Sequence, residues 1–403
     1  MPRRTHPWGA PPWAVDFRPA PRALPDHVDF AIVGGGFSGL SAAAWLRRLA
    51  PHRSVLVLES ASLGEGASGR TGGLALAETA AGPLPGLGDV LAGYKEILRA
   101  LRIDSRLTLP GVWELGRSAP ATAGSGPVGK NSPISWSDSG ELKVVRRVPG
   151  GTIDPGKVLA GLARAAENAG AQIIEHAQVY SVDFSNRLRL HVHRNIRSRI
   201  HRKEIHAKQI LLATNAFSLE LSALRAAAPK LTFALATAPL SVAQLKALGL
   251  SSRRPFYTVD LPYLWGRLLD SNSVIFGAGL VPAPASPSAL LRNPLGARSH
   301  KNVSLHLRRF DVRKGEAAAR LRWLEARVRN LHPALKSVRI THRWGGPILL
   351  TEKMLPVFRR HPRNKNVMIL AGYNGHGVAL SVHLGKWAAE ALLARRPLPP
   401  WHS

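Results

Sequence analysis

The order of apolar and polar positions predicts that the N-terminal part of the chain alternates strands and helices. Residues 29–33 and 54–58 are short apolar runs, as expected of strands buried in a parallel sheet. Residues 40–49 have the composition of a helix, which Pro51 ends. A glycine-rich turn at 34–39 joins the first run to this helix. Strand, turn, helix and strand within roughly thirty residues predict a βαβ unit.

The same rules predict the remaining elements. Residues 157–169 form an amphipathic helix, and residues 209–215 form a buried strand that ends in small and polar residues. Residues 187–193 alternate as a strand with one solvent-facing side, and we expect them to pair with residues 200–206 in a small antiparallel meander. The other expected elements are helices at 91–101, 317–331 and 378–393, and strands at 170–174, 179–184, 263–267, 273–276 and 366–370.

Length and composition place the chain among large folded proteins. Its 403 residues correspond to two or three domains of about 150 residues each. Apolar residues make up 45% and charged residues 20%, which excludes disordered and fibrous classes. No window approaches about 18 uninterrupted apolar residues, so no membrane-spanning helix is predicted. Arg3 and Arg4 precede no apolar stretch, so we expect no export signal and a cytoplasmic protein.

Cysteine usage and charge narrow the chemistry. The chain has no cysteine, which removes disulfides, thiolate metal sites, a cysteine nucleophile and a thioether-linked cofactor. Its formal net charge is +30. A field of that sign attracts anions such as nucleic acid, acidic membrane surfaces, phosphates and carboxylates. A biased genomic base composition is an alternative origin of the arginines, because alanine, proline and glycine are abundant too.

The turn at 34–39 has the spacing of a dinucleotide-binding motif. Gly34 permits the tight turn, Gly36 lets the backbone approach a pyrophosphate, and Gly39 lets the helix pack on the strand. The free N–H groups at the start of the helix favour phosphate oxygens. Glu59, at the end of the second strand, is placed to accept hydrogen bonds from ribose hydroxyls. These features together predict a bound dinucleotide.

Three later segments favour FAD over NAD. The loop 64–73 is rich in small residues, so its backbone can lie flat against a planar ring. The stretch from 150 onward suits a second passage through the nucleotide domain, with Val179 beside the adenine. The turn 372–377 precedes another helix N-terminus, whose N–H groups would face the pyrimidine carbonyl of a flavin.

These residues carry a resemblance to a known family. Residues 33–39, 66–73, 150–155, 213–216 and 372–378 resemble the motifs of the D-amino-acid oxidase type of FAD-dependent oxidoreductases, which includes glycine and sarcosine oxidases. Within it, the chain is most similar to the branch typified by gamma-glutamylputrescine oxidase. The resemblance spans roughly residues 28 to 395. Thr71 stands where the branch usually has asparagine.

The resemblance implies an α/β fold in two domains. One is a discontinuous, doubly wound FAD-binding domain of Rossmann-like type, and the other is an α+β substrate domain on a mixed or antiparallel sheet. The implied division is an N-terminal surface arm at 1–27, an FAD-binding domain at 28–82, 150–235 and 340–395, a substrate domain at 83–149 and 236–339, and a C-terminal tail at 396–403.

The resemblance also implies the chemistry. The family oxidises the C–N bond of a small amine or amino acid by hydride transfer to flavin N5, and the resulting imine hydrolyses. Oxygen or another acceptor then reoxidises the flavin. Without cysteine, FAD is expected to be held non-covalently. The expected cofactor contacts are Gly34, Gly36, Phe37, Ser38, Gly39, Glu59, Ser60, Gly66, Ala67, Ser68, Arg70, Thr71, Gly72, Gly73, Val179, Ala213, Thr214, Asn215, Gly372, Asn374, Gly375, His376, Gly377 and Val378.

Four residues are candidates for contacts with the substrate or the flavin. Arg267 lies where similar enzymes place a strand facing the flavin, so it is placed to clamp a carboxylate, or else is a solvated charge. Trp344 forms a wall of the flavin pocket or packs in the core. His376 lies between two glycines and is expected to contact the ring or the substrate. Arg70 would stabilise an anionic reduced flavin.

Two other functions stay open. One is a flavoenzyme that oxidises a side chain on modified tRNA, which the +30 charge would suit. The other is a non-catalytic flavoprotein whose basic surface binds nucleic acid or another polyanion. No second catalytic domain or RNA-binding module is evident in the sequence. The histidines show no ligand-like spacing with carboxylates, so no metal site is expected.

Overall fold

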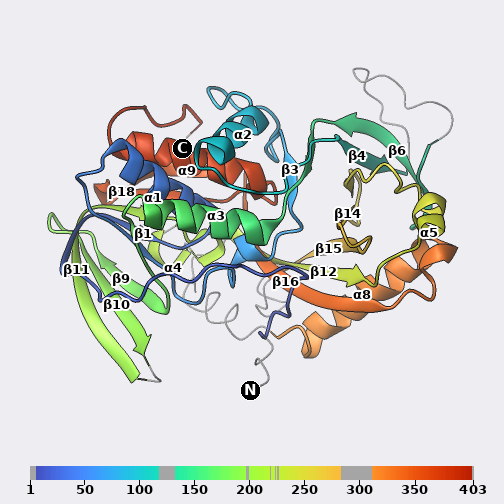
Figure 1. The fold of residues 1–403 in the computed structure, drawn as a ribbon, viewed down its shortest axis with the longest axis horizontal. Helices are drawn as coiled ribbons and strands as arrows, with labels where there is room; N and C mark the ends of the chain where they lie inside the picture. The colour runs from blue at the N-terminus through green and yellow to red at the C-terminus, as the bar shows by residue number, and fades with distance from the viewer. Residues whose placement is uncertain are drawn as a thin grey trace.

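The computed structural model describes residues 6–117, 132–196, 199–217, 219–222, 224, 227–282 and 311–401. Within them the chain forms two eight-stranded sheets and one two-stranded sheet, with helices packed outside (Figure 1). The chain crosses between the two large sheets several times, so neither is built from one continuous stretch. The expected α/β class, with a parallel-centred sheet assembled from separate stretches of the chain, is confirmed.

The first sheet has a parallel centre. Its main path runs β17–β18–β11–β1–β2–β8, in which the pairs between β18 and β8 are parallel and β17 is antiparallel at the edge. β9 and β10 extend β11 as an antiparallel meander. The strands are β1 (His27–Val33), β2 (Val55–Leu58), β8 (Gln172–Ile174), β9 (Ala177–Asp183), β10 (Arg189–Ile196), β11 (Arg199–Leu212), β17 (Val357–His361) and β18 (Asn364–Ala371).

Alternation along β1 explains how this sheet is covered. Phe30 and Ile32 pack in one core with α1 (Phe37–Leu49), α3 (Pro155–Asn168) and α9 (Gly377–Leu392). Ala31 and Val33 point the other way, into a second core that contains the apolar residues of the meander. The sheet is therefore buried on both faces, as a parallel sheet requires. α2 (Val90–Ala100) packs on α9 and contributes Val90, Tyr94 and Ile97 to the first core.

The second sheet is mixed and mostly antiparallel. Its order is β16–β12–β15–β14–β13–β4–β6–β5, with one parallel pair between β13 and β4. The helix α8 (Gly315–Leu331) packs against β12 and β15. The strands are β4 (Val112–Gly116), β5 (Ser135–Ser137), β6 (Glu141–Val148), β12 (Ala227–Thr237), β13 (Phe256–Thr258), β14 (Leu264–Leu268), β15 (Val274–Pro282) and β16 (Ile340–Thr351).

Short elements complete the fold. The two-stranded sheet pairs β3 (Leu74–Leu76) with β7 (Gly150–Thr152). α4 (Leu219–Ser222) follows β11, and α5 (Val242–Ala247) follows β12. Single 3₁₀ turns occur at Ala67–Gly69, Asn215–Phe217 and Pro333–Leu335. No described helix is both long and apolar enough to cross a membrane.

The strand pairing differs from the expected division at two boundaries. β12 and β16 pair with each other over their full length inside the second sheet. Residues 227–235 and 340–351, which we expected in the FAD-binding domain, therefore belong to the other sheet. In addition, the two strands expected at 200–206 and 209–215 are one strand, β11, which joins the meander to the parallel centre. Parts of the expected arm, tail and substrate domain lie outside the described residues.

The N-terminal arm packs closely against the rest of the chain. It runs past the meander and reaches β16, where Gly9 forms an isolated bridge with Trp344 (Figure 1). Trp8 is only 6% exposed. The described part of the C-terminal tail is anchored as well, because Trp401 packs edge-on against Trp387 of α9 at 5.6 Å between ring centroids. The described start of the arm is thus anchored by buried Trp8, while residues 9–27 are half-buried or exposed on the surface.

Candidate functional site

A large cavity lies where the carboxyl ends of β1, β2 and β11 meet the second sheet. Its volume is about 820 Å³, which suits an extended ligand with two or more ring systems. In open α/β sheets, ligands bind at the carboxyl ends of the strands. The main lining segments are 33–38, 58–61, 64–72, 213–217, 346–350 and 373–378.

Two helices point N-termini at this cavity that their own N-cap residues leave without a side-chain bond, although Phe37 N of α1 donates to the Ser68 hydroxyl at 3.0 Å. The N-cap residues are Gly36 for α1 and His376 for α9; neither side chain bonds the helix, and neither helix has an acidic residue in its first turn. By contrast, Asp89 and Asp154 cap α2 and α3 with their side chains. The free N–H groups and the helix dipole of α1 and α9 therefore favour negative charge in the cavity. Such ends suit a pyrophosphate at one helix and an electronegative ring carbonyl at the other.

Glycines leave room for a ligand at these helix ends. A Cβ atom built on Gly66 or Gly375 would meet no atom within 4 Å, and one on Gly36 would meet only the Ser68 side chain. Gly39 serves packing instead, since its Cβ would lie 2.0 Å from the carbonyl oxygen of Gly34. The open space beside Gly66 and Gly375 suits the close approach of a bound dinucleotide to the backbone.

Glu59 is held at the end of β2 with its carboxylate in the cavity wall. One of its oxygens accepts a hydrogen bond from Gly35 N at 2.9 Å, and the other accepts from Ala61 N at 3.0 Å and from the Ser60 hydroxyl at 3.2 Å. Burial raises the pKa of the Glu59 carboxyl, although these hydrogen bonds favour its ionised form. Hydroxyl donors from a ribose would favour that form further.

The loop before α9 is fixed by two asparagines. The Asn215 side chain accepts a hydrogen bond from Gly372 N at 3.0 Å, which ties β11 to β18. The Asn374 side chain accepts from Thr351 N at 2.7 Å and donates to the Gly372 carbonyl at 2.7 Å. Both residues have positive φ angles, which asparagine tolerates. The loop is therefore held rigidly against the end of β16.

His376 lines the cavity as an uncharged imidazole. Burial lowers the pKa of His376 below its usual value, although Glu78 acts in the opposite direction. Its Nδ1 lies 3.2 Å from the Asn374 carbonyl oxygen. Because a carbonyl can only accept, Nδ1 carries the proton and Nε2 is left as the acceptor. The ring is thus prepared to take a hydrogen bond or a proton.

One row of residues crosses the second sheet toward the cavity. Arg146 on β6, Glu114 on β4, Tyr257 on β13 and Trp265 on β14 occupy successive paired positions. Tyr257 and Trp265 line the cavity. The Tyr257 hydroxyl donates to Glu114, which also accepts two hydrogen bonds from Arg146. Burial opposes ionisation of Glu114, but these hydrogen bonds outweigh it and lower the Glu114 pKa.

Trp265 forms a wall between the two halves of the molecule. A Cβ atom on Gly72 would lie 2.1 Å from the indole, and one on Gly277 would lie 2.0 Å from it. Only glycine at these positions lets the ring lie flat between the loop at 64–72 and the second sheet. The indole therefore fixes the width of the cavity at this end.

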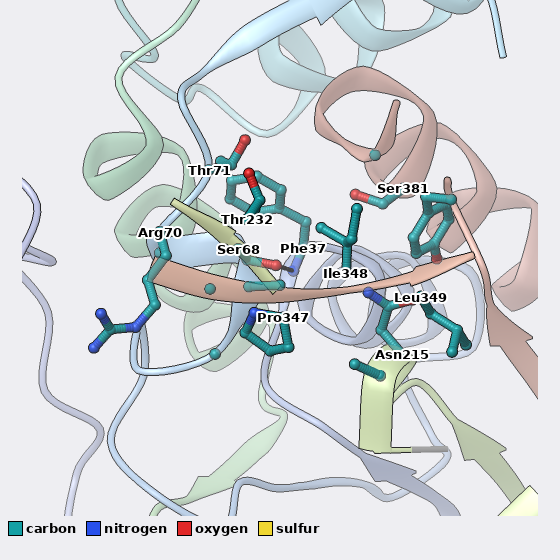
Figure 2. Close-up of a pocket in the computed structure, with 18 of the residues that line it drawn as sticks. Phe37, Ser68, Arg70, Thr71, Asn215, Thr232, Pro347, Ile348, Leu349 and Ser381 are labelled. Atoms are coloured by element: carbon teal, nitrogen blue, oxygen red, sulfur yellow. Dashed lines mark hydrogen bonds between the residues drawn. The ribbon is translucent and has the colours of Figure 1, made fainter. Parts of the chain in front are cut away.

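The structure gathers most of the expected site residues around the cavity, as the close-up in Figure 2 shows for several of them. Those that line it are Gly34, Gly36, Phe37, Ser38, Glu59, Ser60, Gly66, Ala67, Ser68, Arg70, Thr71, Gly72, Val179, Ala213, Thr214, Asn215, Asn374, Gly375, His376, Gly377 and Val378. Gly39, Gly73, Gly372, Arg267 and Trp344 do not line it.

Arg267 and Trp344 lie behind the cavity wall. The Arg267 guanidinium lies 5.7 Å from the centroid of Trp13 on the arm, and burial lowers its pKa to about 10. Trp344 is 1% exposed and donates from its indole nitrogen to the Arg70 carbonyl at 2.9 Å. The arm covers the face of the sheet that carries both residues. Trp344 therefore packs in the core, and Arg267 is buried beneath the arm outside the cavity lining, so a contact of Arg267 with substrate stays a prediction.

Several lining residues were not singled out from the sequence. They include Trp8, Phe217, Tyr257 and Trp265. Trp265 stands two residues before Arg267 on the same face of β14, the strand from which Arg267 was predicted to reach the substrate. Trp8 could have been predicted to pack against the rest of the chain, because it is a large aromatic residue in a stretch otherwise rich in proline and arginine. The described residues contain no group of three or more histidine, aspartate or glutamate side chains that could hold a metal ion.

The family model for FAD-dependent oxidoreductases matches residues 29–391. The chain belongs to this family. FAD is therefore its cofactor, and the resemblance seen in the sequence is confirmed. The two helix N-termini, the open glycines and Glu59 fit the pyrophosphate and ribose of FAD. When bound, FAD supplies the acceptor for a hydride.

Sequence relatives span most of the chain at modest identity. The probable oxidoreductase OrdL of Haemophilus influenzae is 25% identical over 94% of this chain and 86% of that protein. Gamma-glutamylputrescine oxidoreductase of Escherichia coli is also 25% identical, over 90% of this chain and 83% of that protein.

Solved structures share the fold. Glycine oxidase from Geobacillus kaustophilus superposes with a TM-score of 0.65 at 18% identity and covers 92% of this chain and 96% of its own. L-Amino acid deaminase from Proteus myxofaciens gives a TM-score of 0.67 at 14% identity, covering 96% of this chain and 94% of its own. These identities establish the fold alone.

Proposed function

We propose that this FAD-dependent oxidoreductase oxidises the C–N bond of a small amine or amino acid. Relatives and structural neighbours are named for such substrates: a gamma-glutamylputrescine oxidoreductase, a glycine oxidase and an L-amino acid deaminase. The observation in this chain that supports the proposal most directly is His376, an uncharged imidazole in the wall of the FAD cavity.

The proposed role of His376 follows from its protonation state. Amines enter from water as ammonium ions, and an ammonium nitrogen has no lone pair with which to expel a hydride from the adjacent carbon. The free Nε2 of His376 accepts one ammonium proton, so the amine becomes neutral inside the cavity. Bound FAD would supply the hydride acceptor, and the iminium ion left by the amine would be hydrolysed by water to a carbonyl compound and ammonia or a smaller amine.

Tyr257 and Trp265 are proposed to contact the substrate. Both line the cavity from the second sheet, opposite the FAD-binding segments. Glu114 and Arg146 are positioning residues, because they fix the Tyr257 hydroxyl through hydrogen bonds behind the cavity wall. This arrangement presents one aromatic wall and one fixed phenol to a small molecule. Oxygen or another acceptor then reoxidises the cofactor.

The cavity lining favours a small substrate over a polyanion such as modified tRNA. Among the described lining residues Arg70 alone is a lysine or arginine, and its guanidinium is bonded to backbone carbonyls. Glu59 and Glu65 contribute negative charge. The +30 net charge of the chain is therefore not concentrated where substrate would react.

The test compares amines with oxygen analogues in which a hydroxyl or methoxy group replaces the amino group. Glycine and glycolate, sarcosine and methoxyacetate, or an amino acid and its 2-hydroxy acid differ only at the reacting heteroatom. FAD-loaded protein is incubated with each pair and the carbonyl product is measured. Oxidation of the amine member alone supports the proposal. Oxidation of the hydroxy or methoxy members instead would assign C–O chemistry and refute it.

A further inference from the structure

The N-terminal arm enters the wall of the FAD cavity. We use "arm" for residues 6–17. His6, Pro7 and Trp8 line the same cavity as the glycine turn at 34–36, although they lie far from that turn in the sequence. The Trp8 ring stacks on Phe217, another lining residue, with the planes 5° apart and the centroids 6.3 Å apart. Two aromatic rings from distant parts of the chain thus form one continuous side of the cavity.

Arg70 lines the cavity, but its guanidinium is bonded to the arm. Its Nη1 donates to the Gly9 carbonyl at 2.9 Å and the Trp8 carbonyl at 3.2 Å, and its Nε donates to the Glu65 carbonyl at 2.9 Å. Its guanidinium carbon also lies 5.4 Å from the Trp8 ring centroid. Figure 2 shows the Arg70 side chain directed away from the other labelled side chains.

The charge of Arg70 survives its burial. The residue is 7% exposed, and burial lowers the pKa of its guanidinium to about 10, so it stays charged at neutral pH. A buried cation that donates to four backbone carbonyls, those of Glu65, Trp8, Gly9 and Gly345, is held in a fixed position. The hydrogen bonds show that the Arg70 guanidinium holds the arm, and its expected role as a cation beside the flavin stays a prediction.

Further bonds attach the arm to both halves of the molecule. Gly345 N of β16 donates to the Trp8 carbonyl at 2.9 Å, and Val312 N donates to the Pro7 carbonyl at 2.7 Å. The Trp13 indole donates to the Gly69 carbonyl at 2.8 Å. The arm is thus hydrogen-bonded both to the loop at 64–72 and to β16 of the second sheet, and it bridges the two.

We propose that the arm is part of the FAD site: Trp8, held by Arg70, closes one side of the cavity and retards the release of FAD. The chain has no cysteine for a thioether bond to the cofactor, so enclosure contributes directly to retention. Trp8 removes a side of the cavity from water, and Arg70 fixes the segment that carries it. Attachment of the arm and binding of FAD are then coupled equilibria. Bound FAD favours the attached arm by the same factor by which the attached arm tightens FAD binding.

The first experiment measures FAD release from purified holoprotein. Flavin fluorescence is followed after dilution of wild type, Trp8→Ala, Trp8→Phe and Arg70→Lys. We expect Trp8→Ala and Arg70→Lys to release FAD roughly tenfold faster or more, since interface truncations act mainly on dissociation rates. Trp8→Phe keeps a ring against Phe217 and restores slow release. Lysine keeps the positive charge but cannot make the same set of hydrogen bonds as the planar guanidinium. Arg70→Lys therefore distinguishes the effect of these hydrogen bonds from the effect of charge alone.

Phe17→Ala is the matched control. Phe17 lies on the same arm and packs near Arg164, outside the cavity lining. It should release FAD within about twofold of wild type, because it leaves the cavity wall intact. Melting temperatures of apo and holo forms are measured for all variants. A drop of equal size in both forms, with unchanged FAD release, would show a purely structural arm and overturn the proposal.

A measurement on the wild type covers the case in which Trp8→Ala fails to fold. Hydrogen exchange at the Gly345 and Val312 amides reports arm detachment, because both donate to arm carbonyls. FAD should slow their exchange more than that of the β10–β11 meander. Equal effects in both regions would contradict the coupling. No substrate enters these experiments, so a protein that fails to oxidise amines leaves this inference intact.

Discussion

Replacing Glu59 with glutamine should weaken FAD binding far more than it destabilises the apoprotein. The wild-type carboxylate accepts from Gly35 N at 2.9 Å and Ala61 N at 3.0 Å, one on each oxygen. A glutamine has one oxygen, so its amide group faces one donor and cannot accept from a ribose hydroxyl there. A hydrogen bond to a charged group contributes about 1.5–3 kcal/mol. Since 1.4 kcal/mol is tenfold, the Kd for FAD should rise about 10- to 100-fold.

The apoprotein responds differently because of the pKa shift. Burial raises the pKa of Glu59 in the folded state, so its contribution to stability is present at low pH and is lost as pH rises through the folded pKa. Ionised Glu59 is therefore a cost to the apoprotein at neutral pH, and glutamine removes it. The free energy gained in this way offsets the hydrogen bond that either Gly35 N or Ala61 N loses in the glutamine variant. We expect the apo melting temperature to fall much less than the holo one.

The pH dependence gives a second signature. Ribose hydroxyls favour the ionised carboxylate, so FAD binding should release a proton from Glu59 near its raised pKa. Wild-type affinity should fall as pH drops through that pKa, which lies above 4.5, and the affinity of Glu59→Gln should stay flat there. Titration calorimetry at several pH values measures both slopes.

A neighbouring carboxylate provides the control for Glu59. Glu175 accepts a backbone hydrogen bond from Leu63 at 2.6 Å and does not line the cavity. Glu175→Gln should keep the wild-type Kd for FAD and its pH slope. If Glu59→Gln binds FAD as tightly as wild type with the same pH slope, Glu59 does not bind the ribose, and the reasoning fails.

Three further predictions follow from the same geometry. His376→Gln should slow flavin reduction by amine substrates and abolish the acid limb of the pH–rate profile below about pH 6.5, because neutral imidazole is the proton acceptor; rapid-mixing absorbance checks this. Gly72→Val should narrow or displace the site, since its Cβ would lie 2.1 Å from Trp265; a wild-type KM and reduction rate would contradict this. Arg327→Met should lower the free energy of unfolding by about 3–5 kcal/mol in urea titrations, because it leaves buried Asp138 without one of its two arginine partners.

Local patterns were sufficient to predict the nucleotide half of the site. Gly34, Gly36 and Glu59 lie within one βαβ unit, so their spacing in sequence nearly fixes their arrangement in space. The turn before α9 was predictable for the same reason, as a strand followed by glycines and a helix. The FAD cofactor followed from the combination of these motifs with the loop at 64–73.

Features that depend on pairing between distant strands were not predictable. The row from Arg146 through Glu114 to Tyr257 exists only because β6, β4 and β13 pair in one register. β12 and β16 joined the second sheet for the same reason. The burial of Arg267 depends on Trp13 of the arm, which lies more than 250 residues earlier in the chain. Sequence periodicity contains no information about such partners.

Anaerobic reduction of the bound flavin is the most direct test of the proposed function. FAD-loaded protein is mixed without oxygen with glycine derivatives, secondary amines, D- and L-amino acids and gamma-glutamyl polyamines, and the visible flavin absorbance is followed. Bleaching by one of these amine classes, slowed in His376→Gln, is the predicted result, because a reduced flavin records the hydride directly. A flavin that stays oxidised with every amine, yet is reduced by a hydroxy acid or another class of donor, would contradict the account.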